Sequence, residues 1–147
     1  MEIVRCEHIE ANVNNSNDWK HAIYLSGELL LRTGDITEAY IDAMISSVDE
    51  LGPYIVISPG FALAHAQPSE TVLHNSISLI SLATPVEFHS KNDPVRIVMC
   101  IACRDRNAHM ASLQRVAKQL LTPGIIENLS KAKTKEELYE LINAERE

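Results

Sequence analysis

The first third of the chain shows two patterns of apolar and polar positions: alternation at its start, and helical spacing after it. Residues 3–13 alternate loosely, which predicts one or two strands. Asp18 is placed to cap a helix that Gly34 ends, and Asp35 with Glu38 forms a capping box before a second helix. Gly52-Pro53 stops that second helix. The residues expected on the buried faces of these two helices are Trp19, Ala22, Ile23, Ser26, Leu29 and Leu30, then Tyr40, Ile41, Met44, Ile45, Val48 and Leu51.

Apolar runs in the middle of the chain predict the strands of a sheet. Residues 54–57 form a short β-branched run, and residues 61–65 follow the Ser58-Pro59-Gly60 break. Residues 76–83 alternate as a half-buried strand does. Residues 95–103 are apolar nearly throughout, as expected of a strand that is covered on both faces.

The last third returns to helical spacing. Asn107 is placed to cap a helix that Pro123-Gly124 breaks, and Thr134 with Glu137 makes a further capping box. The residues expected to face inward from these helices are Leu113, Val116, Ala117, Leu120 and Leu121, then Leu138, Leu141 and Ile142. Because helices and strands interleave along the chain, the fold class is α/β with a central sheet.

Length and charge narrow the functional classes. The 147 residues fit one domain over 1–147, and a formal charge of -7 argues against a nucleic-acid or anionic membrane partner. The N-terminus lacks the apolar core of a signal peptide, and the longest apolar stretch, 97–103, is too short to cross a bilayer. Three cysteines in a chain without an export signal indicate reduced thiols, and we expect a cytoplasmic protein.

His65 is the first candidate for chemistry. It ends a strand-like segment in which Ala64 and Ala66 leave the imidazole open to another protein's side chain. Pro59 and Pro68 stiffen the approach and the exit. A histidine nucleophile must be neutral, with one nitrogen free and the other bonded to an acceptor such as a backbone carbonyl. A lone histidine in such a loop is more often structural, so a second signal is needed.

That second signal follows the long apolar strand, in Cys103-Arg104-Asp105-Arg106-Asn107-Ala108-His109. With Asn107 as the cap, His109 falls in the first helical turn, where free N–H groups and the helix dipole attract an anion. A histidine there can donate a hydrogen bond to a phosphoryl oxygen, and Arg104 and Arg106 can add positive charge. On spacing alone, such a segment is more often a surface helix start with solvated charges than an anion site.

The two segments together resemble the phosphotransferase-system EIIA domains of the mannitol/fructose type. Residues 50–68 are similar to the family's active-site segment, most of all in its ascorbate branch, where Gly-Pro-Tyr-Ile-Val precedes Pro-Gly-x-Ala-x-x-His. Residues 93–109 resemble the second-histidine motif, and the order of elements fits over nearly the whole chain. The departures are Ala64 where many relatives have proline, Gln67 where ascorbate-type relatives often have arginine, and the lack of an arginine at 48–50.

The resemblance implies a mixed sheet flanked by helices and a phosphoryl relay that needs no metal or cofactor. The phosphocarrier HPr would donate, His65 would accept, and a cysteine of a sugar-specific EIIB would receive the group, with the membrane component EIIC involved only indirectly. His109 would be the neighbouring histidine that helps hold the phosphoryl group. The alternative is an EIIA-like regulatory module that is phosphorylated as a signal, without onward transfer. The presence of both histidines favours the relay.

Two other patterns in the sequence give weaker evidence for a function. Cys100 and Cys103 form a C-x-x-C, but on a strand they point to opposite faces, which favours core packing over a redox site. We expect Cys6 to lie in the core as well. The remaining histidines, His8, His21, His74 and His89, are not spaced as metal ligands are. We expect His74 and His89 to lie at the surface.

Overall fold

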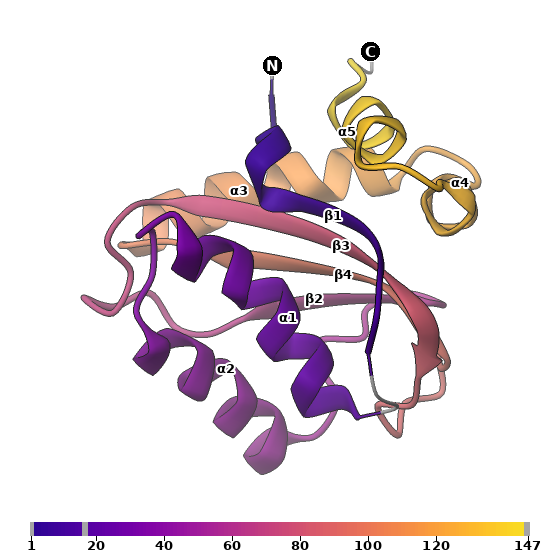
Figure 1. Cartoon of the computed structure of the whole chain (residues 1–147). Helices are drawn as coiled ribbons and strands as arrows, with labels where there is room; N and C mark the ends of the chain where they lie inside the picture. The colour runs from indigo at the N-terminus through magenta and orange to yellow at the C-terminus, as the bar shows by residue number, and fades with distance from the viewer. Residues whose placement is uncertain (1, 16–17, 146–147) are drawn as a thin grey trace.

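A four-stranded sheet lies between two layers of helices in the computed structural model, which describes residues 2–15 and 18–145 (Figure 1). The strands are β1 (Ile9–Val13), β2 (Phe61–His65), β3 (Ser76–Val86) and β4 (Val95–Ala102). The helices are α1 (Trp19–Arg32), α2 (Glu38–Leu51), α3 (Arg106–Leu120), α4 (Ile125–Lys131) and α5 (Lys135–Asn143), with a short 3-10 turn at Cys6–His8. The predicted α/β class with a mixed sheet flanked by helices is therefore confirmed.

The strand order places the ends of several elements at one edge of the sheet. The order is β1-β3-β4-β2; β1 runs parallel to β3 and β2 parallel to β4, whereas β3 and β4 are antiparallel. His65 pairs with Ile101 at the end of β2 and β4, and Ser76 at the start of β3 pairs with Ala102. The chain therefore leaves β2 and β4, and enters β3, at the same edge.

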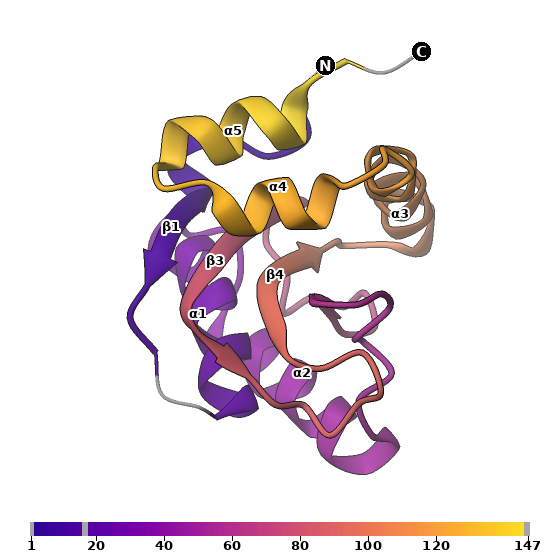
Figure 2. The same ribbon diagram turned by 90° about the vertical axis from the view of Figure 1, so that its right-hand side faces the viewer.

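Alternate strand residues divide the core into two halves. Helices α1 and α2 cover one face of the sheet, and α3, α4 and α5 cover the other (Figures 1 and 2). Cys100 belongs to the first half and Cys103 to the second, which confirms that these thiols point to opposite faces. The residues of β2 that pack on the α3 side are Phe61 and Leu63, and His65 follows them with the same parity.

Two helix starts differ from the prediction. Helix α2 begins after Thr37, not with an Asp35–Glu38 box, because the Asp35 carboxylate lies in the interior and binds other side chains. Helix α3 is capped by Asp105, whose Oδ1 accepts from the Ala108 N–H at 2.8 Å, so Asn107 is already helical. The predicted caps at Asp18 and Thr134 are confirmed by their bonds to the backbone N–H groups of Lys20 and Glu137.

Several other expectations are wrong for local reasons. Residues 54–57 form turns rather than a strand, because the N–H groups of Tyr54 and Val56 donate back to the carbonyls of Gly52 and Pro53. Only residues 9–13 of the first alternating segment form a strand, and α4 is a helix that the spacing did not indicate. Four residues expected inside are exposed: Cys6, Leu51, Ala117 and Leu121. Among the described helices, none combines the length and apolarity of a membrane span.

Candidate functional site

His65 and His109 meet in a cleft at the edge of the sheet where β2 and β4 end. Their ring centroids lie 5.6 Å apart, with 44° between the ring planes. The cleft holds about 510 Å³ between α2, the segment after β2 and the start of α3. Its other lining residues are Ser47, Leu51, Tyr54, Ala66, Gln67, Pro68, Arg106 and Met110. The structure thus brings together the two histidines that the sequence singled out.

His65 is held in one orientation by its own strand. It is half-buried at the end of β2, and its Nδ1 lies 2.8 Å from the Leu63 carbonyl oxygen. A carbonyl oxygen only accepts hydrogen bonds, so Nδ1 carries the hydrogen and Nε2 keeps its lone pair. The ring of Tyr54 contacts the imidazole edge-on, with centroids 5.6 Å apart. When the ring is neutral, this arrangement leaves the lone pair on Nε2.

His109 completes the cleft from the first turns of α3. Its backbone N–H donates to the Asp105 carbonyl at 3.1 Å, so the ring projects from the positive end of the helix dipole. Burial, and next the neighbouring His65, lower the pKa of His109, so the neutral ring is favoured. Its buried Nδ1 has no hydrogen-bond partner among the described residues. An incoming group that offers an oxygen acceptor would satisfy that nitrogen.

Tyr40, which the sequence places on the buried face of a helix, also supports the edge of the cleft. Its hydroxyl accepts from the Ala66 N–H at 3.0 Å and donates to the Ile101 carbonyl at 2.6 Å. These two groups follow β2 and lie in β4, so one side chain of α2 joins the strand ends beside His65. Burial is the main cause that raises the pKa of Tyr40, which keeps the hydroxyl protonated. Helical spacing cannot reveal this role, because both partners are remote in the sequence.

The remaining sequence candidates divide between the cleft and other places. Arg106 borders the cleft, whereas Arg104 is exposed and its N–H donates to the Asn75 side chain at 2.8 Å. Cys100 is fully buried, and burial raises the pKa of its thiol to about 12, which is the opposite of a reactive redox cysteine. Within residues 2–15 and 18–145, no three histidine, cysteine or acidic side chains gather as a metal site.

The chain is similar to known proteins over nearly its whole length. Residues 2–145 match the family model described as "Phosphoenolpyruvate-dependent sugar phosphotransferase system, EIIA 2". The chain is 31% identical over 129 residues to the phosphotransferase IIA component SgcA of Escherichia coli K12, covering 87% of this chain and 90% of that protein. It is 32% identical over 127 residues to the ascorbate-specific EIIA component of the same organism, covering 85% and 82%.

A solved structure shares the whole fold. The solution structure of the mannitol-specific cryptic phosphotransferase enzyme IIA CmtB from Escherichia coli superposes with a TM-score of 0.84 at 27% identity, covering 97% of this chain and 98% of that one. The match of the family model over almost the entire chain, the relatives above 30% identity and the shared fold all agree. The chain therefore belongs to the EIIA type 2 family and is a component of a sugar phosphotransferase system.

Proposed function

We propose that His65 accepts a phosphoryl group from phospho-HPr in the cytoplasm and passes it to a cysteine of a cognate EIIB. The observation that carries this proposal is the bond between His65 Nδ1 and the Leu63 carbonyl, which leaves Nε2 unprotonated and directed by a rigid strand. The Nε2 lone pair forms a new N–P bond while the P–N bond in the donor breaks, and the electron pair returns to the donor imidazole. In the second transfer, the thiolate of the EIIB cysteine forms an S–P bond while the N–P bond to His65 breaks, and the electron pair returns to Nε2.

His109 and Arg106 are the residues proposed to stabilise the group in transfer. Phosphoryl transfer depends mainly on alignment and on charge stabilisation around the equatorial oxygens. His109 lies beside His65 with an unsatisfied buried nitrogen, and Arg106 is the first residue of α3. Together they can supply hydrogen bonds and positive charge, which compensates for the absent arginine at 48–50.

The rim of the cleft suits a protein partner rather than a small molecule. Leu51, Tyr54 and Met110 are apolar or aromatic, and they are 72%, 42% and 50% exposed. Exposed apolar side chains grouped around a reactive residue are typical of a docking surface. They fit a donor and an acceptor protein that bind to the same cleft in turn.

The identity to ascorbate-specific relatives supports ascorbate or a related carbohydrate as the transported compound.

Labelling from phospho-HPr tests the acceptor. We expect the protein to take up one phosphoryl group in a bond that is stable in alkali and labile in acid, as a phosphoimidazole is. His65→Ala should abolish labelling, while His89→Ala, a change at an exposed histidine away from the cleft, should label normally. Normal labelling of His65→Ala would show that another residue is the acceptor.

Discharge separates the relay from the regulatory alternative. The labelled protein, mixed with EIIB proteins of ascorbate-like systems, should lose its label to a cysteine of one of them. Retention of the label with every EIIB tested would favour an EIIA-like module that is phosphorylated only as a signal.

A further inference from the structure

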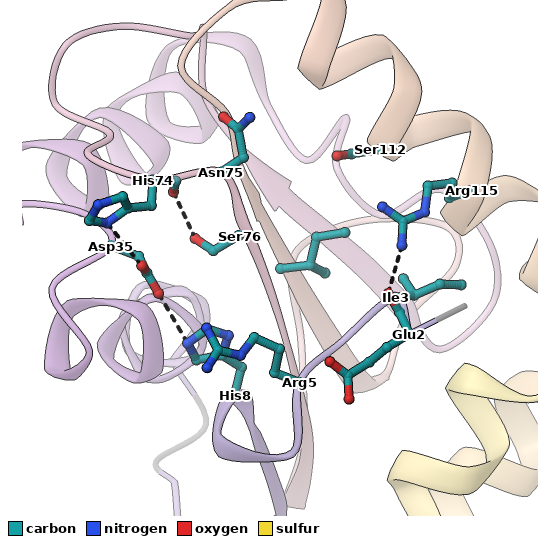
Figure 3. A pocket seen from close by; sticks show the side chains of 11 residues that line it. Glu2, Ile3, Arg5, His8, Asp35, His74, Asn75, Ser76, Ser112 and Arg115 are labelled. Carbon is teal, nitrogen blue, oxygen red and sulfur yellow. Dashed lines mark hydrogen bonds and ion pairs between the residues drawn. The ribbon is translucent and has the colours of Figure 1, made fainter.

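A second cavity, of about 590 Å³, lies between the N-terminal segment, the loop before β3 and α3 (Figure 3). It shares no lining residue with the cleft of His65. Nine of its eleven lining residues have polar or charged side chains, and the lining comes from segments far apart in the sequence. The residues used below are Arg5, His8, Asp35, His74, Asn75 and Arg115.

The carboxylate and amide oxygens that line this cavity, those of Asp35, Asn75 and Glu2, each have a partner within the protein; Glu2 Oε2 accepts from the Tyr139 hydroxyl. Asp35 is 8% exposed and binds three side chains: His8 Nε2 lies 3.1 Å from its Oδ2, the Thr33 hydroxyl 2.7 Å from the same oxygen, and His74 Nδ1 3.3 Å from Oδ1. The Asn75 side-chain oxygen accepts from a backbone N–H, that of Arg104. Little capacity remains to receive hydrogen bonds from a ligand.

The donors, in contrast, remain available. Arg115 reaches from α3 toward the N-terminal segment, and one of its nitrogens donates to the Glu2 carbonyl at 2.7 Å (Figure 3). Among the described residues it makes no ion pair, so most of its five N–H donors face the cavity uncommitted. The Nδ1 of His74 is bound to Asp35, so in the neutral ring Nε2 is an acceptor, and the ring, 72% exposed, borders the cavity without adding a donor. The Asn75 amide N–H groups are further donors at the cavity wall. Arg5 stands at the mouth, paired with Glu7.

A cavity whose acceptors are occupied and whose donors are free is suited to a ligand that only accepts. Carboxylate and phosphate groups have this property, and an arginine fork binds either with two parallel bonds. The buried Asp35 network also fixes His74 before any ligand arrives, which lowers the entropy cost of binding.

We propose that this cavity binds a small metabolite through a phosphate or carboxylate group, held by the Arg115 guanidinium and the Asn75 amide, beside the ring of His74. The site is separate from the phosphoryl-transfer cleft and does not depend on the function proposed for His65. Helix α3 and the segment that joins β2 to β3 border both cavities, so a ligand here would contact the elements that carry His109 and follow His65.

Amide chemical shifts of the 15N-labelled protein test this directly, with inorganic phosphate and acetate as probes at constant pH and ionic strength. We expect saturable shifts at residues 74–76, 112 and 115 with one or both anions, and the stronger response identifies the preferred group. The same residues should respond in His65→Ala, because the two cavities are distinct. A change confined to the residues of the His65 cleft, or no response to either anion, would overturn the proposal.

Arg115→Gln should weaken binding by about 10- to 100-fold, the effect of removing a charged hydrogen-bond donor. Arg32→Gln is the matched control, since it makes the same charge change at an exposed residue of α1 that pairs with Glu28. Equal binding by the two variants would contradict the proposal. If Arg115→Gln does not fold, Asn75→Ala removes the amide donor of the same site at an exposed residue, and its binding should fall several-fold.

Discussion

The molecule places two pairs of histidines near one edge of its sheet, and the two pairs have different partners. His65 and His109 lie ring to ring in the cleft, and within residues 2–15 and 18–145 the Leu63 carbonyl is the only hydrogen-bond partner of either ring. His8 and His74 share the carboxylate of Asp35. A carboxylate favours the protonated ring, whereas a carbonyl selects a tautomer without adding charge.

The difference explains how one small protein can hold reactive and structural histidines close together. The acceptor role proposed for His65 needs a ring nitrogen with a free lone pair, and the Leu63 carbonyl selects the tautomer that leaves this lone pair on Nε2. His8, in contrast, is 2% exposed and bonded on Nε2, so it serves as a link between Asp35 and the N-terminal segment. The partner of each ring, rather than the histidine itself, separates the two roles.

The largest effect is expected from breaking the reactive pair. His109→Ala should fold normally and still become labelled, but its rate of phosphoryl uptake should fall about 100-fold, as when one donor to a transition-state oxygen is removed. Rapid-quench measurement of uptake from phospho-HPr gives this rate. An unchanged rate would remove His109 from the site.

Tyr40→Phe tests the support behind His65 without changing either histidine. The variant leaves the buried Ala66 N–H and Ile101 carbonyl without their partner, so the free energy of unfolding should fall by about 2–3 kcal/mol. Because the strand ends beside His65 are no longer joined, uptake should also slow several-fold. Urea unfolding and the labelling rate check the two effects.

Tyr24→Phe is the control for that change, since its hydroxyl makes a single long contact of 3.5 Å with Glu38 at the surface. It should leave both quantities unchanged. Equal loss in the two variants would mean that the Tyr40 hydroxyl has no special role.

Asp35→Asn removes the carboxylate that His8 and His74 share and leaves His65 and His109 unchanged. Loss of the charge-assisted bonds to His8 and His74 should lower the free energy of unfolding by about 1–2 kcal/mol, while the labelling rate stays within about twofold of the parent. Asp42→Asn, the same change at an exposed residue of α2, should affect neither. A fall in labelling as deep as that of His109→Ala would erase the distinction between the pairs.

The smallest effect concerns pH. The pKa values of His109 and His8 are both lowered from 6.5, chiefly by burial, so the unfolded chain binds more protons than the folded one just below that pH. Stability should therefore be greatest above pH 6.5 and fall as the pH drops through the window beneath it. Chemical denaturation at several pH values should show a shallower fall for His109→Gln. An identical slope would show that His109 does not contribute to this dependence.

The sequence predicted the elements of this fold better than it predicted their starts. Asp18 and Thr134 cap helices as expected because their side chains meet only their own backbone. Asp35 has the same local pattern, but three remote or neighbouring side chains compete for its carboxylate inside the protein. Such competition depends on the tertiary structure, so local spacing cannot predict it.

The sequence also predicted only some of the residues of the site. His65 and His109 stand out because two short motifs follow strands that end at the same edge, and the sheet brings them together. Tyr40 carries no comparable signal, since its partners are 26 and 61 residues away and its spacing fits any buried helical position. The cavity of Asp35 and Arg115 joins the N-terminal segment to α3, which no local pattern connects.

The central claim is that His65 is the acceptor and that Nε2 is its reactive atom. Long-range 1H–15N spectra of the imidazole rings, recorded on the phosphorylated protein, distinguish the two ring nitrogens of every histidine. We predict that only His65 changes, with the phosphoryl group on Nε2 and the hydrogen on Nδ1 retained against the Leu63 carbonyl. A phosphoryl group on Nδ1 of His65, or on another histidine, would contradict it.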